Sequence, residues 1–194
     1  MVNRAPFFPV SLNLVGRRCV VIGAADDREA VEKEEALRES GADVRWIQDP
    51  AALRDDDLSD VFFVISTPQD DALSARLRAL ADRHAFLLCC IDQPKYGFVA
   101  MAAIAKAGPV RISIATSGLA PRIGKILKAR LQAAMDDRFA RFVDRLGEMK
   151  LKMQREKPGP DYAGERRAAM IEAADGFDAE VRFTYPPWFD GPRG

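Results

Sequence analysis

The side chain best placed for chemistry in this sequence is a carboxylate that directly follows an apolar segment. Asp92 comes after residues 85–91, which have the composition of a buried strand, and stands two residues before Pro94. Open α/β sheets bind ligands at the carboxyl ends of their strands, where a carboxylate can take up a proton or hold a metal ion. The alternative is a structural role, in which Asp92 caps the N-terminus of a helix. The residue types leave both interpretations open.

A small-residue turn near the start of the chain is the second feature with chemical meaning. The apolar segment 19–22 ends at Gly23, which is followed by Ala24 and Ala25. Dinucleotide-binding domains begin with a strand, a glycine-rich turn that cradles the pyrophosphate, and a helix. The motif G-x-G-x-x-G/A is only partly present, because the methyl group of Ala25 stands where a glycine lets the phosphates approach the backbone. The pattern predicts the fold more strongly than it predicts the cofactor.

Negative charge follows this turn. Asp26, Asp27 and Glu29 lie where a pyrophosphate would be bound. They oppose the favourable interaction between an anion and the N-terminus of a helix. We therefore expect any binding of NAD to be weak.

The elements that would carry these residues alternate regularly in the first half of the chain. Helix-forming segments separate apolar segments of strand length at residues 19–22, 44–47, 61–66 and 85–91. This order is typical of a parallel sheet with helical crossovers. After Gly97 the pattern changes, because residues 110–115 alternate apolar and polar and amphipathic helices follow. We predict an α/β protein with a Rossmann-like parallel sheet over residues 1–107, a small dimerisation region over 108–150 and a C-terminal helical region over 151–194.

Composition excludes several classes of partner. Lysine plus arginine and aspartate plus glutamate both number 29, so no overall field attracts nucleic acid or a membrane surface. No apolar stretch approaches the roughly 20 residues that span a bilayer, and residues 1–5 lack the apolar core of a signal peptide. The cysteines Cys19, Cys89 and Cys90 fall in predicted strands, where neighbours point to opposite faces, so we expect buried free thiols and no metal site. We expect a cytoplasmic protein.

Four local patterns together resemble one enzyme family. They are the lead-in Phe-Pro-Val-Ser-Leu at residues 8–12, the Asp92-x-Pro94 step, the turn Thr-Ser-Gly-Leu-Ala-Pro at 116–121 and the run Gly-Glu-Arg-Arg at 164–167. They resemble the precorrin-2 dehydrogenases of siroheme biosynthesis. The resemblance implies NAD-dependent oxidation of precorrin-2 to sirohydrochlorin, in some members insertion of ferrous iron, and a homodimer.

The resemblance also implies roles for individual residues. Asp92 matches the aspartate implicated in catalysis and chelation, which favours the catalytic interpretation. The cofactor-binding residues would be Gly23, Ala24, Ala25 and Thr67, and the substrate-binding residues would be Thr116, Ser117 and Arg122. A tetrapyrrole with many carboxylates requires cationic donors such as Arg122.

The chain departs from the family at the first turn, where members usually read Gly-Gly-Gly. The change at Ala24 and Ala25 keeps two alternatives open. One is an enzyme that only inserts iron, with Asp92 accepting the pyrrole protons. The other is a Rossmann-like protein that binds a tetrapyrrole or a nucleotide without catalysis.

Overall fold

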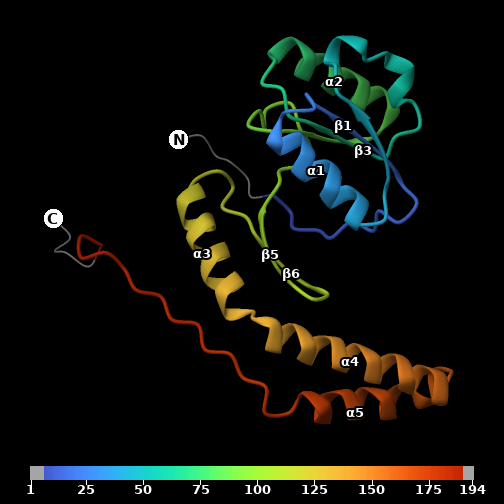
Figure 1. Ribbon diagram of the computed structural model, residues 1–194, viewed down its shortest axis with the longest axis vertical. Coiled ribbons are helices and arrows are strands. Elements are labelled where there is room, and N and C mark those ends of the chain that lie inside the picture. The colour runs from blue at the N-terminus through green and yellow to red at the C-terminus, as the bar shows by residue number, and fades with distance from the viewer. Residues whose placement is uncertain (1–6, 190–194) are drawn as a thin grey trace. The chain divides into compact units, whose positions relative to one another are not determined.

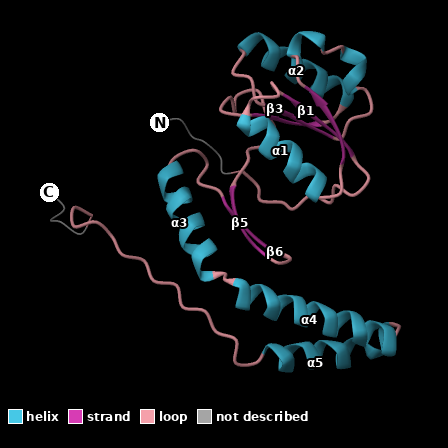
Figure 2. Ribbon diagram, viewed as in Figure 1, coloured by secondary structure: helices cyan, strands magenta, loops and turns pink. Residues whose placement is uncertain are grey.

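The computed structural model describes residues 7–189 (Figure 1). Its first part is a four-stranded parallel sheet with the strand order β2-β1-β3-β4. Figure 2 shows the strands in magenta and the helices in cyan. The strands are β1 (Arg18–Ile22), β2 (Asp43–Ile47), β3 (Phe63–Ser66) and β4 (Leu87–Cys90). The helix α1 (Arg28–Glu39) connects β1 to β2, and α2 (Asp71–His84) connects β3 to β4. The predicted Rossmann-like parallel sheet is confirmed.

Both faces of the sheet are buried, which explains the continuous apolar runs of its strands. Val20, Val64 and Cys90 pack on one face, in a core cluster that also holds the α2 residues Leu73, Leu77 and Leu80. Cys19, Val21, Ile65 and Cys89 pack on the other face, with Ala30 and Leu37 of α1. Cys89 and Cys90 therefore point to opposite faces, as the period of two in a strand requires.

Local signals set the ends of both helices. Asp27 is the N-cap of α1, and Gly41 follows its C-cap with a φ of 78°, a conformation that favours glycine. Asp70 is the N-cap of α2, and its carboxylate accepts hydrogen bonds from the backbone N–H groups of Ala72 and Leu73. The two short 3₁₀ turns Pro50–Ala52 and Asp55–Leu58 lie between β2 and β3.

A two-stranded sheet follows β4. It pairs β5 (Ala103–Ala107) with β6 (Val110–Ile114), and the two-residue connection makes it a hairpin. The sequence predicts β6 but not β5. The β5 segment Ala-Ile-Ala-Lys-Ala is rich in alanine, which has a low strand propensity, so its pairing with β6 decides its conformation.

The chain divides into two compact units. Among the described residues, the first unit comprises 7–104 and 113–129, and the second comprises 105–112 and 130–189. Helix α3 (Pro121–Ala134) contributes to both units. In the second unit, α4 (Asp137–Glu156) packs against α5 (Ala163–Ala174), with a third 3₁₀ turn at Pro160–Tyr162 between them. The predicted division into residues 1–107, 108–150 and 151–194 stays a prediction.

A small apolar cluster stabilises the second unit. Ala105, Ala107 and Met135 are its buried members, and Leu131 and Phe139 pack against them. Phe177, which follows α5, stacks on Phe142 of α4 with ring centroids 5.4 Å apart.

In the part of the chain that the structure describes, no helix is both long and apolar enough to cross a membrane.

Candidate functional site

The predicted cofactor residues meet at the carboxyl edge of the sheet, where β1 and β3 end side by side. Gly23 follows β1, and Thr67 follows β3. From β1 the chain passes through α1 on one face, and from β3 it passes through α2 on the other face. Open α/β sheets bind ligands at such a point, where the direction of the connections reverses. The structure thus brings Gly23 and Thr67 together at the expected place.

The contact between these two residues leaves no room for a side chain at position 23. A Cβ atom on Gly23 would lie 2.2 Å from Oγ1 of Thr67 and 2.9 Å from Cβ of Ala30. Trp46 of β2 donates a hydrogen bond from Nε1 to the Gly23 carbonyl oxygen at 2.8 Å. The glycine therefore lets β1, β3 and α1 approach one another, which is a structural role beside the predicted cofactor contact.

The turn beyond Gly23 is open to solvent. Ala24 and Ala25 are exposed, and the Asp27 N–H group closes the turn by donating to the Ala24 carbonyl oxygen at 3.1 Å. This exposed turn lies between β1 and α1, where dinucleotide-binding domains hold their pyrophosphate.

The negatively charged carboxylate of Asp27 lies at the N-terminus of α1 and binds donors there. One carboxylate oxygen accepts the Glu29 N–H group at 2.9 Å, and the other accepts the Thr67 hydroxyl group. The Thr67 hydrogen bond, assisted by the backbone N–H groups of Glu29 and Ala30, lowers the pKa of Asp27 below its ordinary value. The sequence predicts an opposing charge here but not this contact. An aspartate immediately before a helix-forming segment is the signal that indicates the cap.

Asp92 is exposed at the same edge, after β4. Its φ is 57°, a left-handed conformation that aspartate tolerates better than most residues do. Gln69 donates a hydrogen bond from Nε2 to Oδ2 of Asp92 at 3.3 Å. No helix begins at Asp92, so the alternative that it caps one is wrong.

Hydrogen bonds to α2 hold the turn that carries Asp92. The Ser74 hydroxyl group donates to Oε1 of Gln93 at 2.5 Å, and Nε2 of Gln93 donates to Oδ1 of Asp71 at 2.8 Å. Lys95 forms an ion pair with Asp71 at 3.2 Å. These contacts fix the turn that carries Asp92 relative to α2, while the Asp92 side chain itself faces solvent.

The predicted substrate residues form a separate turn before α3. Leu119 donates its N–H group to the Thr116 carbonyl oxygen at 3.0 Å, and Ser117 has a φ of 51°. Arg122 is exposed in the first turn of α3. Over residues 7–189, no hydrogen bond or ion pair joins Thr116, Ser117 or Arg122 to Asp92. Their action on one substrate stays a prediction.

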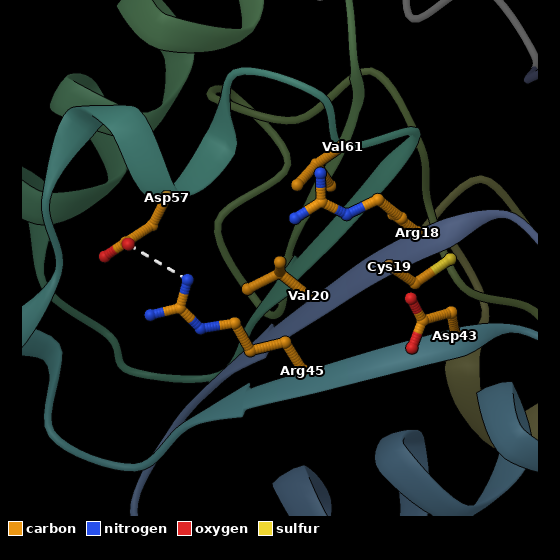
Figure 3. A pocket seen from close by; sticks show the side chains of 7 residues that line it. All are labelled: Arg18, Cys19, Val20, Asp43, Arg45, Asp57 and Val61. Carbon is orange, nitrogen blue, oxygen red and sulfur yellow. Dashed lines mark hydrogen bonds and ion pairs between the residues drawn. The ribbon is translucent and has the colours of Figure 1, made fainter.

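A pocket of about 210 Å³ lies elsewhere on the first unit, toward the amino ends of the strands (Figure 3). Arg18 and Asp43 are the first residues of their strands and line it. Arg45 also lines it and donates to Oδ1 of Asp57 at 2.9 Å. Ligands of parallel α/β sheets bind at the opposite, carboxyl edge, so we do not assign the chemistry to this pocket.

Among the described residues, no three histidine, cysteine, aspartate or glutamate side chains gather as they would around a metal ion.

The chain matches known proteins over much of its length. Residues 10–103 match the family model NAD_binding_7, described as "Putative NAD(P)-binding". The siroheme synthase of Hahella chejuensis is 29% identical over 157 residues, which cover 71% of this chain and 33% of that protein. Over 71% of its length, this chain is similar to a siroheme synthase. The family resemblance predicted from the sequence is confirmed.

Other matches extend further along the chain. The siroheme synthase of Nitrosospira multiformis is 23% identical over 198 residues, which cover 92% of this chain and 41% of that protein. A solved structure named "SirC, precorrin-2 dehydrogenase" has the same fold, with a TM-score of 0.68 and 18% identity over 87% of this chain and 90% of that one. The chain spans about a third of the length of the Hahella chejuensis relative.

The residues at the carboxyl edge fit a dinucleotide in part. The exposed turn at Ala24 and Ala25 leaves backbone accessible beside α1, where the connections that follow β1 and β3 lead to opposite faces of the sheet. Two features oppose binding. The methyl group of Ala25 stands where a glycine would let the phosphates approach, and Asp27 holds the donors at the start of α1 that a pyrophosphate would use.

Proposed function

We propose that this chain oxidises precorrin-2 to sirohydrochlorin, with NAD as the cofactor. The observation that carries the proposal is the carboxylate of Asp92 at the carboxyl edge of a Rossmann-like sheet, in a relative of the siroheme synthases. Gly23, Ala24, Ala25 and Thr67 would contact the cofactor there. The similarity to a precorrin-2 dehydrogenase in fold supports the same assignment.

The proposed chemistry needs a group that takes up a proton. Oxidation of precorrin-2 removes a hydride and a proton from the macrocycle, and NAD supplies the hydride acceptor when it is bound. Asp92 takes the proton, because it is a carboxylate at the ligand-binding edge. Gln69 steadies this side chain through Oδ2, and the bonds of Gln93 to α2 fix the turn below it.

The carboxylates of the substrate would be bound by the turn before α3. The Arg122 guanidinium group is exposed and suits bidentate contact with a carboxylate. Thr116 and Ser117 would add hydroxyl donors. We assign these three residues to substrate binding in the proposed enzyme.

Replacement of Asp92 tests the proposal. Asp92→Asn keeps the size of the side chain and its tolerance of the left-handed conformation, but it removes the proton acceptor. We expect an unchanged melting curve and a rate of sirohydrochlorin formation that falls by roughly 100-fold or more. The matched control is Asp60→Asn, because Asp60 is an exposed aspartate toward the amino edge, and it should retain full activity. A folded Asp92→Asn protein with full activity would contradict the catalytic role.

Iron insertion is the second candidate, favoured by the negative charge of Asp27 at the expected phosphate position. In this case Asp92 accepts pyrrole protons as ferrous iron enters sirohydrochlorin. The parent protein would then insert iron without consuming precorrin-2 or binding NAD. A parent protein inactive in both assays would leave the non-catalytic binding protein as the alternative.

We also propose that the protein acts as a homodimer through residues 108–150. Exposed apolar side chains on and just before α3 support this, since Leu119, Ile123 and Ile126 are 75%, 52% and 47% exposed.

The free, buried thiols of the three cysteines support a cytoplasmic location, where the environment is reducing.

A further inference from the structure

The N–H donors at the start of α1 are engaged by a carboxylate of the chain itself. The carboxylate of Asp27 accepts the Glu29 N–H group at 2.9 Å and the Thr67 hydroxyl group. These donors come from the two elements that meet at the ligand-binding edge, α1 and the segment after β3. In dinucleotide-binding domains the N–H groups at this helix terminus bind the pyrophosphate.

The position of Asp27 distinguishes it from the other acidic residues of the turn. Asp26 is exposed, whereas Asp27 is half-buried and accepts hydrogen bonds from both elements. A pyrophosphate that approached the start of α1 would meet a fixed negative charge at the donors that it needs. Binding therefore requires that the Asp27 side chain release these donors.

We propose that Asp27 is an affinity-determining residue, which competes with the pyrophosphate of the dinucleotide for the start of α1. The inference rests on the proposed function, because it assumes that NAD binds at this edge. Release of the Asp27 carboxylate frees the Glu29 N–H group and the Thr67 hydroxyl group for the phosphate oxygens. The cost of that release makes the dinucleotide bind weakly.

Calorimetric titration of Asp27→Asn tests this competition. Asparagine still caps a helix through its side-chain oxygen, so the variant keeps the fold. It loses the charge and one of the two acceptor oxygens, so the Thr67 hydroxyl group is no longer held by a carboxylate. We expect its affinity for NAD and for inorganic pyrophosphate to rise roughly fivefold to tenfold over the parent protein. Adenosine, which has no phosphate, should show no such gain. The matched control is Asp26→Asn, which removes a neighbouring exposed charge and should change either affinity by less than about twofold.

The outcomes separate this inference from the proposed function. If the parent protein binds NAD and Asp27→Asn binds it no better, the competition is wrong and the NAD-dependent function stands. Equal gains for Asp26→Asn and Asp27→Asn would also overturn the inference, because they would indicate a general charge effect. If no variant binds NAD or pyrophosphate at millimolar concentration, both the competition and the NAD-dependent function are wrong. A melting curve for each variant confirms that the compared proteins are folded.

Discussion

At the scale of single residues, the carboxyl edge depends on contacts between groups far apart in the sequence. Gly23 and Thr67 are in contact although 44 positions separate them, and Asp27 meets the same threonine. The three residues join β1, α1 and the segment after β3 at one point. A change at any of them therefore affects both the packing of the sheet and the turn that would receive a ligand.

Replacement of Gly23 by alanine should destabilise the protein. The added methyl group would collide with Oγ1 of Thr67 and Cβ of Ala30, and overpacking of this kind costs about 1–3 kcal/mol. Denaturant unfolding followed by the fluorescence of Trp46, which donates to Gly23, would measure the loss. Gly147→Ala is the control, because it lies in α4 with no atom within 4 Å of the added group and should not lower stability. An unchanged midpoint for Gly23→Ala would contradict the packing role.

At the scale of elements, α2 is a helix with one strained end. Asp70 satisfies N–H groups at its start, but its C-cap is Ala85 with a φ of 59°. A left-handed conformation costs a residue with a Cβ atom roughly 1–2 kcal/mol, and glycine avoids that cost. Ala85 is exposed, so its methyl group contributes little packing in return.

We expect Ala85→Gly to stabilise the protein. The removal of backbone strain stabilises the folded state by more than the greater conformational entropy of glycine stabilises the unfolded chain. The free energy of unfolding should therefore rise by about 0.5–1 kcal/mol. The opposite result is expected for Ala79→Gly, which lies exposed within the same helix and should lose about 1 kcal/mol. Denaturant titration of both variants would check the pair. Equal losses in the two variants would show that the end of α2 is not strained.

At the scale of the whole molecule, burial decides the chemistry of the cysteines. Cys19, Cys89 and Cys90 are buried in the sheet. Burial raises the pKa of all three thiols and brings that of Cys89 to about 12. The reactive thiolate is therefore scarce near neutral pH.

Thiol labelling should follow unfolding. We expect a disulfide-exchange reagent at pH 8 to leave the folded protein almost unmodified and to label three thiols per chain in denaturant. Mass spectrometry of protein quenched at successive times would count the modified residues. Rapid labelling of Cys89 in the native protein would contradict its burial.

The proposed dimer can be tested through the exposed apolar residues of α3. Sedimentation velocity at micromolar concentration should detect a dimer, and Ile123→Glu together with Ile126→Glu should shift it to monomer by placing charge in an apolar interface. Ile171→Glu is the control, because Ile171 is 65% exposed on α5, outside the proposed interface. A monomeric parent protein would overturn the proposed dimer.

The sequence by itself determined the elements of the sheet and the edge where chemistry is expected. Each buried strand is a local apolar run, and an aspartate caps the start of both α1 and α2, so these features can be predicted without knowledge of their partners. The opposite faces of Cys89 and Cys90 follow from the period of two in any strand. The position of Asp92 after β4 follows from the end of an apolar segment.

Only the tertiary structure decided which residues of different elements contact one another. Gly23 must be a glycine because Thr67, in the segment after β3, leaves no room for a side chain there, and Asp27 accepts a hydrogen bond from that same threonine. Strand β5 exists because β6 pairs with it, and Gln69 holds Asp92 from the loop after β3. The physical reason is the same in each case. Hydrogen bonds and close packing between distant segments depend on how the sheet assembles, and no local pattern encodes that assembly.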